Sequence, residues 1–410
     1  MTEPPVSNRR QTRVTILVEN LPVPLDRRVW TEALALVRAE YHVSVICPQT
    51  ARHPLAYEEL EGVHIFRHPL PLEARGIAGF FLEYAAALLG ELRLAFTVRR
   101  RFGIDIIQLC NPPDILFLVA LVFRWLDGCK IVFDHHDPFP ELMAIKFPRR
   151  KLLWRLARLC ERLTFRSADQ VITTSEALRR IAMTRGGVPA DRIALVRSGI
   201  DLSRFRTGEA MRSEAVRKGA QHVVAYLGII GSQDGVDLLL EAAHSVLRDR
   251  GRTDVRFLVI GDGPMLPALK IRAQELGIAA DVEFPGYTSG EALYRLLASS
   301  DIGVCPDPKN DFNDKLSMNK IIEYMAFGLG VAMFPLEEGM LLAGPAAEVA
   351  DGLEPPALAD AILRLLDDPH RRQALAGIAR ARVEELFTWP VHEKAYLAAY
   401  ARVAEGSTAA

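Results

Sequence analysis

Residues 313–331 join a polar loop to a helical pattern, and their types suit the binding of a phosphate group. Asn313 and Asp314 are good helix caps, apolar residues recur after them at helical spacing, and Gly328 ends the pattern. We therefore expect a helix over about residues 316–327. The first turn of such a helix leaves backbone N–H groups unpaired and carries the positive end of the helix dipole, so it can bind an anion such as a diphosphate.

Side chains near this helix start add to the expected anion site. Lys315 and Lys320 supply positive charge beside it. The backbone amides of Met318, Asn319 and Lys320 are the expected donors to phosphate oxygens. One turn later Glu323 interrupts an otherwise apolar face, where a carboxylate needs hydroxyl or amide partners, and ribose hydroxyls would serve. The alternative is a capped core helix with a solvated glutamate.

Length and composition favour a two-domain globular protein. The chain has 410 residues, 50% of them apolar, and one hydrophobic core rarely supports so long a chain. The formal net charge of -1 gives no indication of a nucleic-acid partner. The five cysteines are scattered singly, without the paired spacing of a zinc site or a redox dithiol.

The N-terminal residues 1–12 are polar and contain prolines, so we expect them to be disordered. They lack the apolar core of a secretory signal peptide. No stretch of about 18 uninterrupted apolar residues occurs in the chain. These features predict a cytoplasmic protein.

Short β-branched runs alternate with helical patterns along the chain, which predicts parallel sheets with helices on both faces. A polar, charged stretch interrupts the series at residues 205–220. We therefore predict two doubly wound α/β domains, over residues 13–204 and 221–387, joined by a linker at 205–220. Pro390 should break the helical path before the final segment.

Polar side chains are concentrated in the loops that follow three strands of the first domain. Ligands of such sheets bind beyond the carboxyl ends of the strands, so these loops form a candidate substrate site. In a second interpretation the same side chains only pair with each other or cap the helices that follow. The candidate residues are Asp26, Arg28, Asn111, Asp114, His136 and Asp137.

The histidine pair His135 and His136 stands at the end of a strand, beside Asp134 and Asp137. Neighbouring side chains of a strand point to opposite faces, so at most one of the two histidines would face the site. This argues against a metal centre here, and we predict no metal ligands.

Five short segments of the second domain have an order and spacing typical of one enzyme family. Together they resemble family 4 retaining glycosyltransferases, and the resemblance spans roughly residues 14–402. In the first domain, residues 23–29 and 111–114 are similar to the subset of this family that serves bacterial cell-surface polysaccharide assembly. The five segments are residues 225–228, 235–242, 258–264, 284–287 and 323–328.

The resemblance implies a GT-B fold, in which two Rossmann-like domains face each other across a cleft and a final helix, here within residues 388–410, crosses back to the first domain. It implies transfer of a sugar from a nucleotide-diphosphate donor, of UDP or GDP type, to an acceptor hydroxyl. The anomeric configuration would be retained, no metal ion would be needed, and the departing diphosphate would help to deprotonate the acceptor.

The resemblance also implies roles for individual residues. The first domain would hold the acceptor, and His136 would face the donor sugar. In the second domain, Glu323 would hold the ribose, and Gly286 with Tyr287 would contact the base. The implied catalytic residues are His136, Lys320 and Glu323, and the implied donor-binding residues are Gly228, Gly263, Gly286, Tyr287, Lys315, Met318, Asn319, Lys320 and Glu323.

The chain departs from the family pattern at three places. Lys315 stands where the family has the first of two glutamates, and residues 229–234 lack the arginine and lysine that clamp the diphosphate. Lys315 and Lys320 are the candidate substitutes for that clamp. Leu329 and Gly330 stand where a lysine or similar residue and a proline are commoner. Two other functions therefore stay open: a sugar-nucleotide epimerase of the same fold, and a non-catalytic binding or scaffold protein.

Residues 149–166 predict a basic amphipathic helix. Such a helix suits an anionic membrane surface, here the inner leaflet, and would bring the enzyme to a lipid-linked saccharide acceptor. The alternative is a charged, solvent-facing side of an ordinary domain helix.

Overall fold

The computed structural model describes residues 11–69, 76–202 and 211–405, and the chain divides into two compact units. The first unit consists of residues 1–196 and 392–410, and the second consists of residues 197–391. The expected disorder of residues 1–12 falls mostly outside the described residues.

Among the described residues, the first unit contains an eight-stranded sheet with the order β3-β4-β2-β1-β5-β6-β7-β8. Every neighbouring pair is parallel except β3 with β4. The central strands are buried along nearly their whole length, because helices cover both faces, and this explains their continuous apolar runs. The strands are β1 Arg13–Val18, β2 His42–Pro48, β3 Tyr57–Leu60, β4 Val63–His68, β5 Ile106–Cys110, β6 Lys130–His135, β7 Gln170–Thr173 and β8 Ile193–Leu195.

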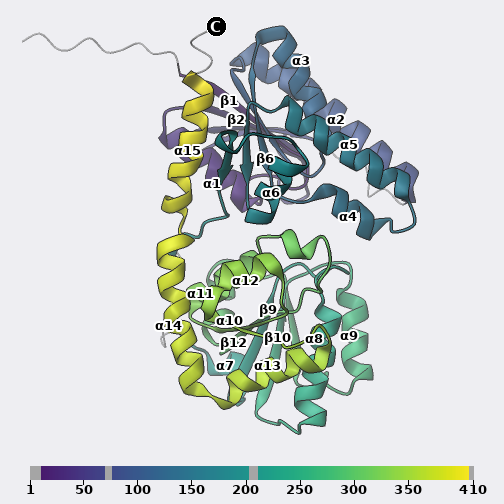
Figure 1. The fold of residues 1–410 in the computed structure, drawn as a ribbon, viewed down its shortest axis with the longest axis vertical. Helices are drawn as coiled ribbons and strands as arrows, with labels where there is room; N and C mark the ends of the chain where they lie inside the picture. The colour runs from purple at the N-terminus through teal and green to yellow at the C-terminus, as the bar shows by residue number, and fades with distance from the viewer. Residues whose placement is uncertain (1–10, 70–75, 203–210, 406–410) are drawn as a thin grey trace, which may run out of the picture. The chain divides into compact units, whose positions relative to one another are not determined.

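Helices α2, α3, α5 and α6 pack on one face of this sheet around a common apolar core. Helix α1 and the C-terminal helix α15 lie on the other face (Figure 1). The bounds are α1 Arg27–Arg38, α2 Gly76–Arg101, α3 Phe117–Asp127, α4 Phe139–Lys146, α5 Lys151–Ser167, α6 Glu176–Thr184 and α15 Trp389–Glu405, with a short 3₁₀ turn at Ala190–Arg192.

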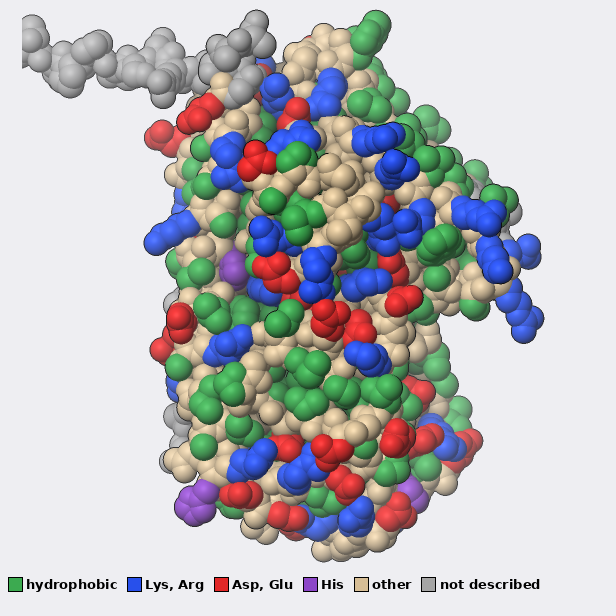
Figure 2. All heavy atoms as spheres, in the orientation of Figure 1, with side chains coloured by type: hydrophobic (Ala, Val, Ile, Leu, Met, Phe, Trp, Pro, Cys, Tyr) green, Lys and Arg blue, Asp and Glu red, His purple; other side chains and the backbone are tan. Residues whose placement is uncertain are grey.

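The outer face of α5 exposes apolar and basic side chains together. Leu152, Leu156, Leu159 and Leu163 form one row along the helix, with exposed fractions of 77%, 43%, 52% and 36%. A row of basic residues runs beside them, and Figure 2 shows basic and hydrophobic side chains interleaved over α5. On the neighbouring α3, Trp125 is 85% exposed. Among the described residues, no helix is both long and apolar enough to cross a bilayer.

The second unit contains, in its described part, a six-stranded sheet with the order β11-β10-β9-β12-β13-β14, and all neighbouring strands are parallel. Helices α8, α9 and α13 bury one face of the sheet, and α10, α11, α12 and α14 bury the other. The strands are β9 His222–Leu227, β10 Val255–Ile260, β11 Val282–Gly286, β12 Ile302–Cys305, β13 Gly330–Met333 and β14 Ala347–Val349. The helices are α7 Glu214–Arg217, α8 Val236–His244, α9 Leu266–Glu275, α10 Gly290–Ala298, α11 Asn319–Phe327, α12 Glu337–Ala343, α13 Pro355–Asp367 and α14 Pro369–Leu386. A π-helical segment, Ser245–Asp249, continues α8, and short 3₁₀ turns lie at Asn313–Lys315 and Gly344–Ala346.

The contacts divide the chain after Val196 and after Val391, instead of at the sequence-based limits 204 and 387. Part of the expected linker packs on the second unit, since Arg217 Nη1 donates to the Ser299 carbonyl at 2.9 Å. Helix α15 begins in the second unit and continues into the first, as expected for a returning helix. The prediction of two doubly wound α/β domains is confirmed.

Candidate functional site

In the sheet of the second unit, the order in which successive strands are added reverses at β9. This strand lies between β10 and β12, so the loops after β9 and β12 lead to opposite sides of the sheet. Ligands of doubly wound proteins bind at the carboxyl ends of strands at such a point. Leu227 ends β9 and Cys305 ends β12, and the loops that follow them are therefore the candidate binding segments.

Glycines let three strand ends approach each other closely at this edge. A Cβ on Gly261 would lie 1.8 Å from the Gly228 carbonyl oxygen, and a Cβ on Gly263 would lie 2.4 Å from the Ile230 carbonyl oxygen. The Gly261 amide donates to the Gly286 carbonyl at 3.1 Å. The structure thus brings Gly228, Gly263 and Gly286 together, and only glycine fits at the closest contacts. Tyr287, which follows, is half exposed.

The start of helix α11 differs from the expectation. The helix begins at Asn319, and Met318 is its N-cap residue, without a side-chain cap. Asp314, expected as a cap of this helix, instead accepts the Glu337 amide at 2.8 Å at the start of α12. Asn313, the other expected cap, donates to the Gln233 carbonyl at 2.9 Å. The C-terminal end agrees with the expectation, since Gly328 closes the helix at φ 70°.

Lys320 is held by an ion pair that sequence reasoning missed. Its Nζ lies 2.9 Å and 2.8 Å from the two carboxylate oxygens of Asp307, and the Lys320 and Asp307 side chains are only 10% and 3% exposed. The ammonium also lies 4.8 Å from the centre of the Tyr226 ring. Burial lowers the pKa of Lys320, but the Asp307 carboxylate outweighs it, and the pKa is well above its usual range. The Lys320 ammonium is therefore held in place by an ion pair, which the expectation of two lysines beside the helix start did not include.

The remaining candidate donor-binding residues at the start of α11 differ in their exposure to solvent. Asn319 is exposed and Met318 is buried, whereas Lys315 is half-buried and has an interaction partner. Glu323 is half-buried and also has an interaction partner. The next residue, Tyr324, is fully buried; it donates its hydroxyl to the Val304 carbonyl and accepts the Leu227 amide.

Tyr324 thus ties α11 to the ends of β9 and β12, a role that sequence reasoning missed. Its only sequence signal is an aromatic residue with a polar group in an apolar helix face. Loop 229–234, which lacks the arginine and lysine, is fixed by its own contacts. Asp234 accepts the Gly231 amide at 2.9 Å, and Tyr226 donates to the Ile229 carbonyl at 2.6 Å.

In the first unit, β1 occupies the corresponding position between β2 and β5. Arg28, in the first turn of α1, is buried and points at the end of β6. Its Nη2 donates to Asp134 Oδ1 at 2.8 Å and its Nη1 donates to the Val196 carbonyl at 2.8 Å. Asp134 Oδ2 in turn lies 2.5 Å from His136 Nε2. Arg28 is therefore a buried partner of the histidine's carboxylate, and its side chain is not free for a ligand.

The ion pair of Arg28 and Asp134 holds one ring nitrogen of His136. Burial raises the pKa of Asp134, but Arg28 and His136 outweigh it and hold the pKa below its usual range, so Asp134 is ionised. His136 Nε2 lies 2.5 Å from this carboxylate and 2.9 Å from Arg28 Nε, so it contacts both members of the ion pair. Nδ1 is then the ring nitrogen that can meet a substrate, and the ring is 17% exposed.

His135 points the other way, as the alternation along the strand predicts. It is fully buried and lies 5.1 Å, centroid to centroid, from the Phe165 ring. Burial lowers the pKa of His135 to about 3, so it is neutral.

Asn111 fixes the backbone of the histidine loop. Its Oδ1 accepts the His136 amide at 2.6 Å, and its Nδ2 donates to the Asp137 carbonyl at 2.8 Å and to Asp114 Oδ1 at 3.0 Å. Asp114 is buried and does not cap the following helix, because α3 begins at Phe117 with Leu116 as its N-cap. Burial raises the pKa of Asp114 well above its usual range.

The remaining two candidates lie near this loop. Asp26 is the N-cap of α1 and accepts the Val29 amide at 3.0 Å. Asp137 precedes Pro138, the N-cap residue of α4, and this helix has no side-chain cap, so the capping interpretation does not hold for Asp137. Burial raises the pKa of Asp137, and the negative charge of the nearby Asp26 adds to this increase.

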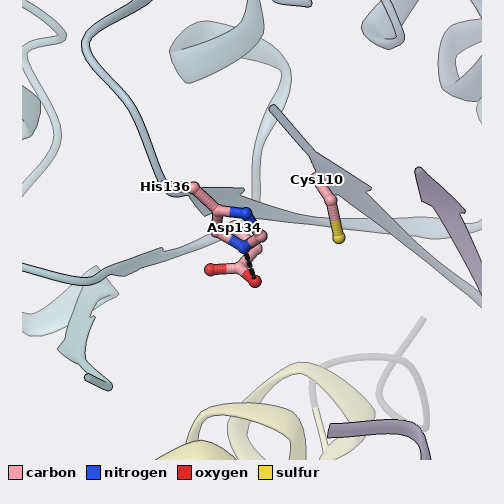
Figure 3. Close-up of side chains that lie close together, drawn as sticks. All are labelled: Cys110, Asp134 and His136. Atoms are coloured by element: carbon pink, nitrogen blue, oxygen red, sulfur yellow. Dashed lines mark hydrogen bonds and ion pairs between the residues drawn. The ribbon is translucent and has the colours of Figure 1, made fainter. Parts of the chain in front are cut away.

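Three side chains of the first unit have metal-ligand chemistry and lie close together. Among the described residues, the ligand atoms of Cys110, Asp134 and His136 all lie within 4.8 Å of one another (Figure 3). A cation would compete there with the Arg28 guanidinium, which already neutralises Asp134. It would also need the Cys110 thiolate, and burial raises the pKa of that thiol well above its usual range. The arrangement therefore favours an ion-paired cluster over a metal centre.

Comparisons with known proteins cover both units. Residues 25–204 match the model of Glycosyltransferase Family 4, and residues 221–368 match the model of Glycosyl transferases group 1. The alpha-D-kanosaminyltransferase of Streptomyces kanamyceticus is 25% identical over 331 residues, which are 75% of this chain and 80% of that protein. Several other curated relatives match over only about half of their own length.

Solved structures agree with this result. Sucrose-phosphate synthase from Thermosynechococcus elongatus superposes with a TM-score of 0.81 at 18% identity, over 97% of this chain and 100% of that one. Anabaena Alr3699/HepE, solved in complex with UDP and glucose, gives a TM-score of 0.70 at 17% identity, over 98% of this chain and 100% of that one. This likeness confirms the GT-B fold. Since two glycosyltransferase models match successive parts of the chain, the protein is a glycosyltransferase, and its first unit is similar to family 4.

Proposed function

We propose that this glycosyltransferase moves a sugar from a nucleoside-diphosphate donor, of UDP or GDP type, to an acceptor hydroxyl, with retention and without a metal ion. The observation that carries the proposal is the carboxyl edge of the second sheet, where Gly228, Gly261 and Gly263 bring bare backbone beside the start of α11. Backbone amides without side chains can approach a diphosphate closely. The likeness in fold to a protein solved with UDP supports the same assignment.

The diphosphate would meet the first turn of α11 and the Lys320 ammonium. The N-cap Met318 offers no side-chain oxygen, so the first amides of the helix have no cap from it. Lys320 is already fixed by Asp307, and a preorganised charge costs no reorganisation when the phosphate charge develops. Removing one such donor typically costs about 3 kcal/mol, roughly a hundredfold in rate.

The reaction breaks the bond between the anomeric carbon and the diphosphate oxygen and forms a bond from the same carbon to the acceptor oxygen, on the same face of the sugar. The acceptor proton passes to the departing diphosphate. In the first unit, His136 would orient a substrate hydroxyl through Nδ1, while Asp134 and Arg28 hold its Nε2. Glu323 would accept hydrogen bonds from the ribose hydroxyls.

Calorimetric titration with UDP, GDP, dTDP and CDP tests the donor site. We expect one diphosphate to bind selectively, and we expect both Glu323→Ala and Lys320→Ala to weaken that binding at least tenfold. Lys270→Ala, at an exposed lysine of α9 in the same unit, is the matched control. If no nucleotide binds, or if the control weakens binding as much as the two site variants do, the proposed donor site is wrong.

We further propose that the acceptor is lipid-linked and that the outer face of α5 holds the enzyme on the anionic inner leaflet. The support is the combination of an exposed leucine row with Arg155, Arg162 and Arg166 on the same helix. Each basic residue near an anionic surface contributes about 1 kcal/mol, and the leucines can enter the headgroup boundary.

Sedimentation with vesicles of phosphatidylglycerol and phosphatidylcholine tests this surface. We expect binding to the anionic vesicles, and we expect Leu156→Glu with Leu159→Glu to abolish it. Ile271→Glu, at a residue that is 57% exposed in the second unit, is the control. Equal binding by the double variant and the wild type would show that α5 is an ordinary solvent-facing helix.

A further inference from the structure

Arg197, the first residue of the second unit, is a buried cation beside the start of α11. The residue is only 8% exposed. Its Nη1 donates to Glu338 Oε1 at 2.6 Å and lies 3.4 Å from Ser317 Oγ. Ser317 directly precedes Met318, the N-cap residue of α11. A guanidinium therefore stands next to the helix start at which we place the diphosphate.

Glu338 holds this guanidinium from the first turn of α12. The glutamate is fully buried, and the turn is tied to the loop before α11, because Asp314 accepts the Glu337 amide at 2.8 Å. The turn also packs on α11 itself, since a Cβ on Gly339 would lie 3.5 Å from Ile321 Cδ1. The guanidinium is thus kept at a fixed place, and a preorganised charge need not reorganise when a ligand binds.

The neighbouring loops provide little positive charge for a diphosphate. Residues 229–234 contain no arginine or lysine, and Asp234 places a carboxylate there, which accepts the Gly231 amide at 2.9 Å. The Lys320 ammonium is balanced by Asp307, which binds it through both carboxylate oxygens. A diphosphate at this edge needs a further cation. A guanidinium suits phosphate well, because its charge is permanent and it is more weakly hydrated than an ammonium group.

We propose that Arg197 supplies the diphosphate site with the positive charge that residues 229–234 lack, while Glu338 keeps the guanidinium in place. Arg197 need not touch the phosphates, since a charge held within roughly 10 Å changes their binding through its field. The role rests on the proposed function, in which the diphosphate meets the first turn of α11.

Variants that each remove one charge of the pair separate an electrostatic role from a structural one. At roughly 10 Å and an effective dielectric constant of about 20, one unit charge changes an affinity about tenfold. We therefore expect Arg197→Met to weaken the binding of the preferred nucleoside diphosphate about tenfold, and Glu338→Gln to tighten it about tenfold. Lost packing alone would weaken the binding in both variants.

Two further variants complete the set. Lysine keeps the positive charge, so Arg197→Lys should restore the affinity to near the wild-type level even though it loses the planar guanidinium. Arg364→Met is the matched control, because Arg364 also pairs with a buried glutamate, Glu348, at 2.6 Å. Arg364 lies on α13, which packs on the opposite face of the sheet from α11 and α12, so we expect its loss to leave the affinity unchanged.

Calorimetric titration with UDP, GDP, dTDP and CDP measures these affinities, after circular dichroism has shown that each variant is folded. Opposite shifts in Arg197→Met and Glu338→Gln, with an unchanged Arg364→Met, would support the proposal. Any other pattern in folded variants would overturn it and leave the proposed function intact. If the wild type binds none of the four diphosphates, the proposed function is wrong, and the role of Arg197 falls with it.

Arg197→Met leaves the Glu338 carboxylate buried without its partner, which can prevent folding. In that case the other two variants of the pair decide. Glu338→Gln keeps an acceptor oxygen for the guanidinium, and tighter binding by this variant together with near wild-type binding by Arg197→Lys would support the proposal. Unchanged or weaker binding by Glu338→Gln would overturn it.

Discussion

Replacing Asp307 with asparagine is predicted to destabilise the second unit while tightening nucleotide binding. The Asp307 carboxylate binds Lys320 Nζ through both oxygens, and the two side chains are almost fully buried. Breaking a buried pair by removing one charge costs about 3–5 kcal/mol. Asparagine keeps the shape and one acceptor oxygen, so we expect about 3 kcal/mol.

The effect on binding has the opposite sign, because Asp307 places a negative charge near the proposed phosphate position. At a separation of about 7 Å and an effective dielectric constant of about 20, one unit charge contributes roughly 2 kcal/mol. Asp307→Asn should therefore bind the preferred nucleoside diphosphate about thirtyfold more tightly. Lys320→Ala should weaken it, because that variant leaves Asp307 without its partner.

Urea unfolding and calorimetric titration measure the two effects on the same protein samples. Asp351→Asn is the control, since Asp351 forms an ion pair at 86% side-chain exposure, and such pairs contribute little to stability. The pKa of Lys320 is raised in the folded state. The ion pair therefore contributes its full stabilisation below the unfolded-state pKa of about 10.4, and this contribution is lost only at higher pH. The stability difference should therefore be constant from about pH 6 to about pH 9. Loss of stability with unchanged or weaker nucleotide binding would refute the proposed place of the phosphates.

Two further predictions concern residues around the sites. Burial and the nearby Glu83 carboxylate raise the pKa of Glu19 to about 7 in the folded state. The folded state therefore binds this proton more tightly than the unfolded state, and the stability of the fold falls as pH rises from about 4.5 through about 7. Glu19→Gln should remove that decline in urea melts at pH 5 and 8, and an unchanged pH slope would contradict the assignment. Gly261→Ala should cost more than about 2 kcal/mol and weaken nucleotide binding, because its Cβ would meet the Gly228 carbonyl at 1.8 Å. Gly377→Ala, in open space on α14, should be neutral or stabilising by up to about 1 kcal/mol, and equal losses in both would contradict the packing argument.

The fold could be predicted because its signal is local. Strands buried on both faces read as short β-branched runs, and the helices between them read as longer amphipathic patterns. The boundaries between the units could not be predicted, because they depend on which sheet a polar segment packs against. Residues 211–220 have the composition of a linker, but Arg217 is buried against the second unit.

Only part of the candidate sites could be predicted, because several of their contacts join segments that are distant in the sequence. Asn313 and Asp314 have the right types for helix caps, but composition does not reveal that Asp314 caps α12. The pairing of Lys320 with Asp307 joins two segments through the end of β12, and nothing in the local sequence predicts it. By contrast, the alternation along β6 does predict that His135 and His136 point to opposite sides.

The position of the nucleotide is the central claim, and hydrogen–deuterium exchange with the diphosphate that binds most tightly tests it most directly. The account predicts slower exchange on binding in peptides that cover residues 228–235, 260–264 and 318–323, and predicts that Glu323→Ala loses this protection at the same ligand concentration. Protection confined to other peptides, or none in these three while calorimetry records binding, would contradict the claim.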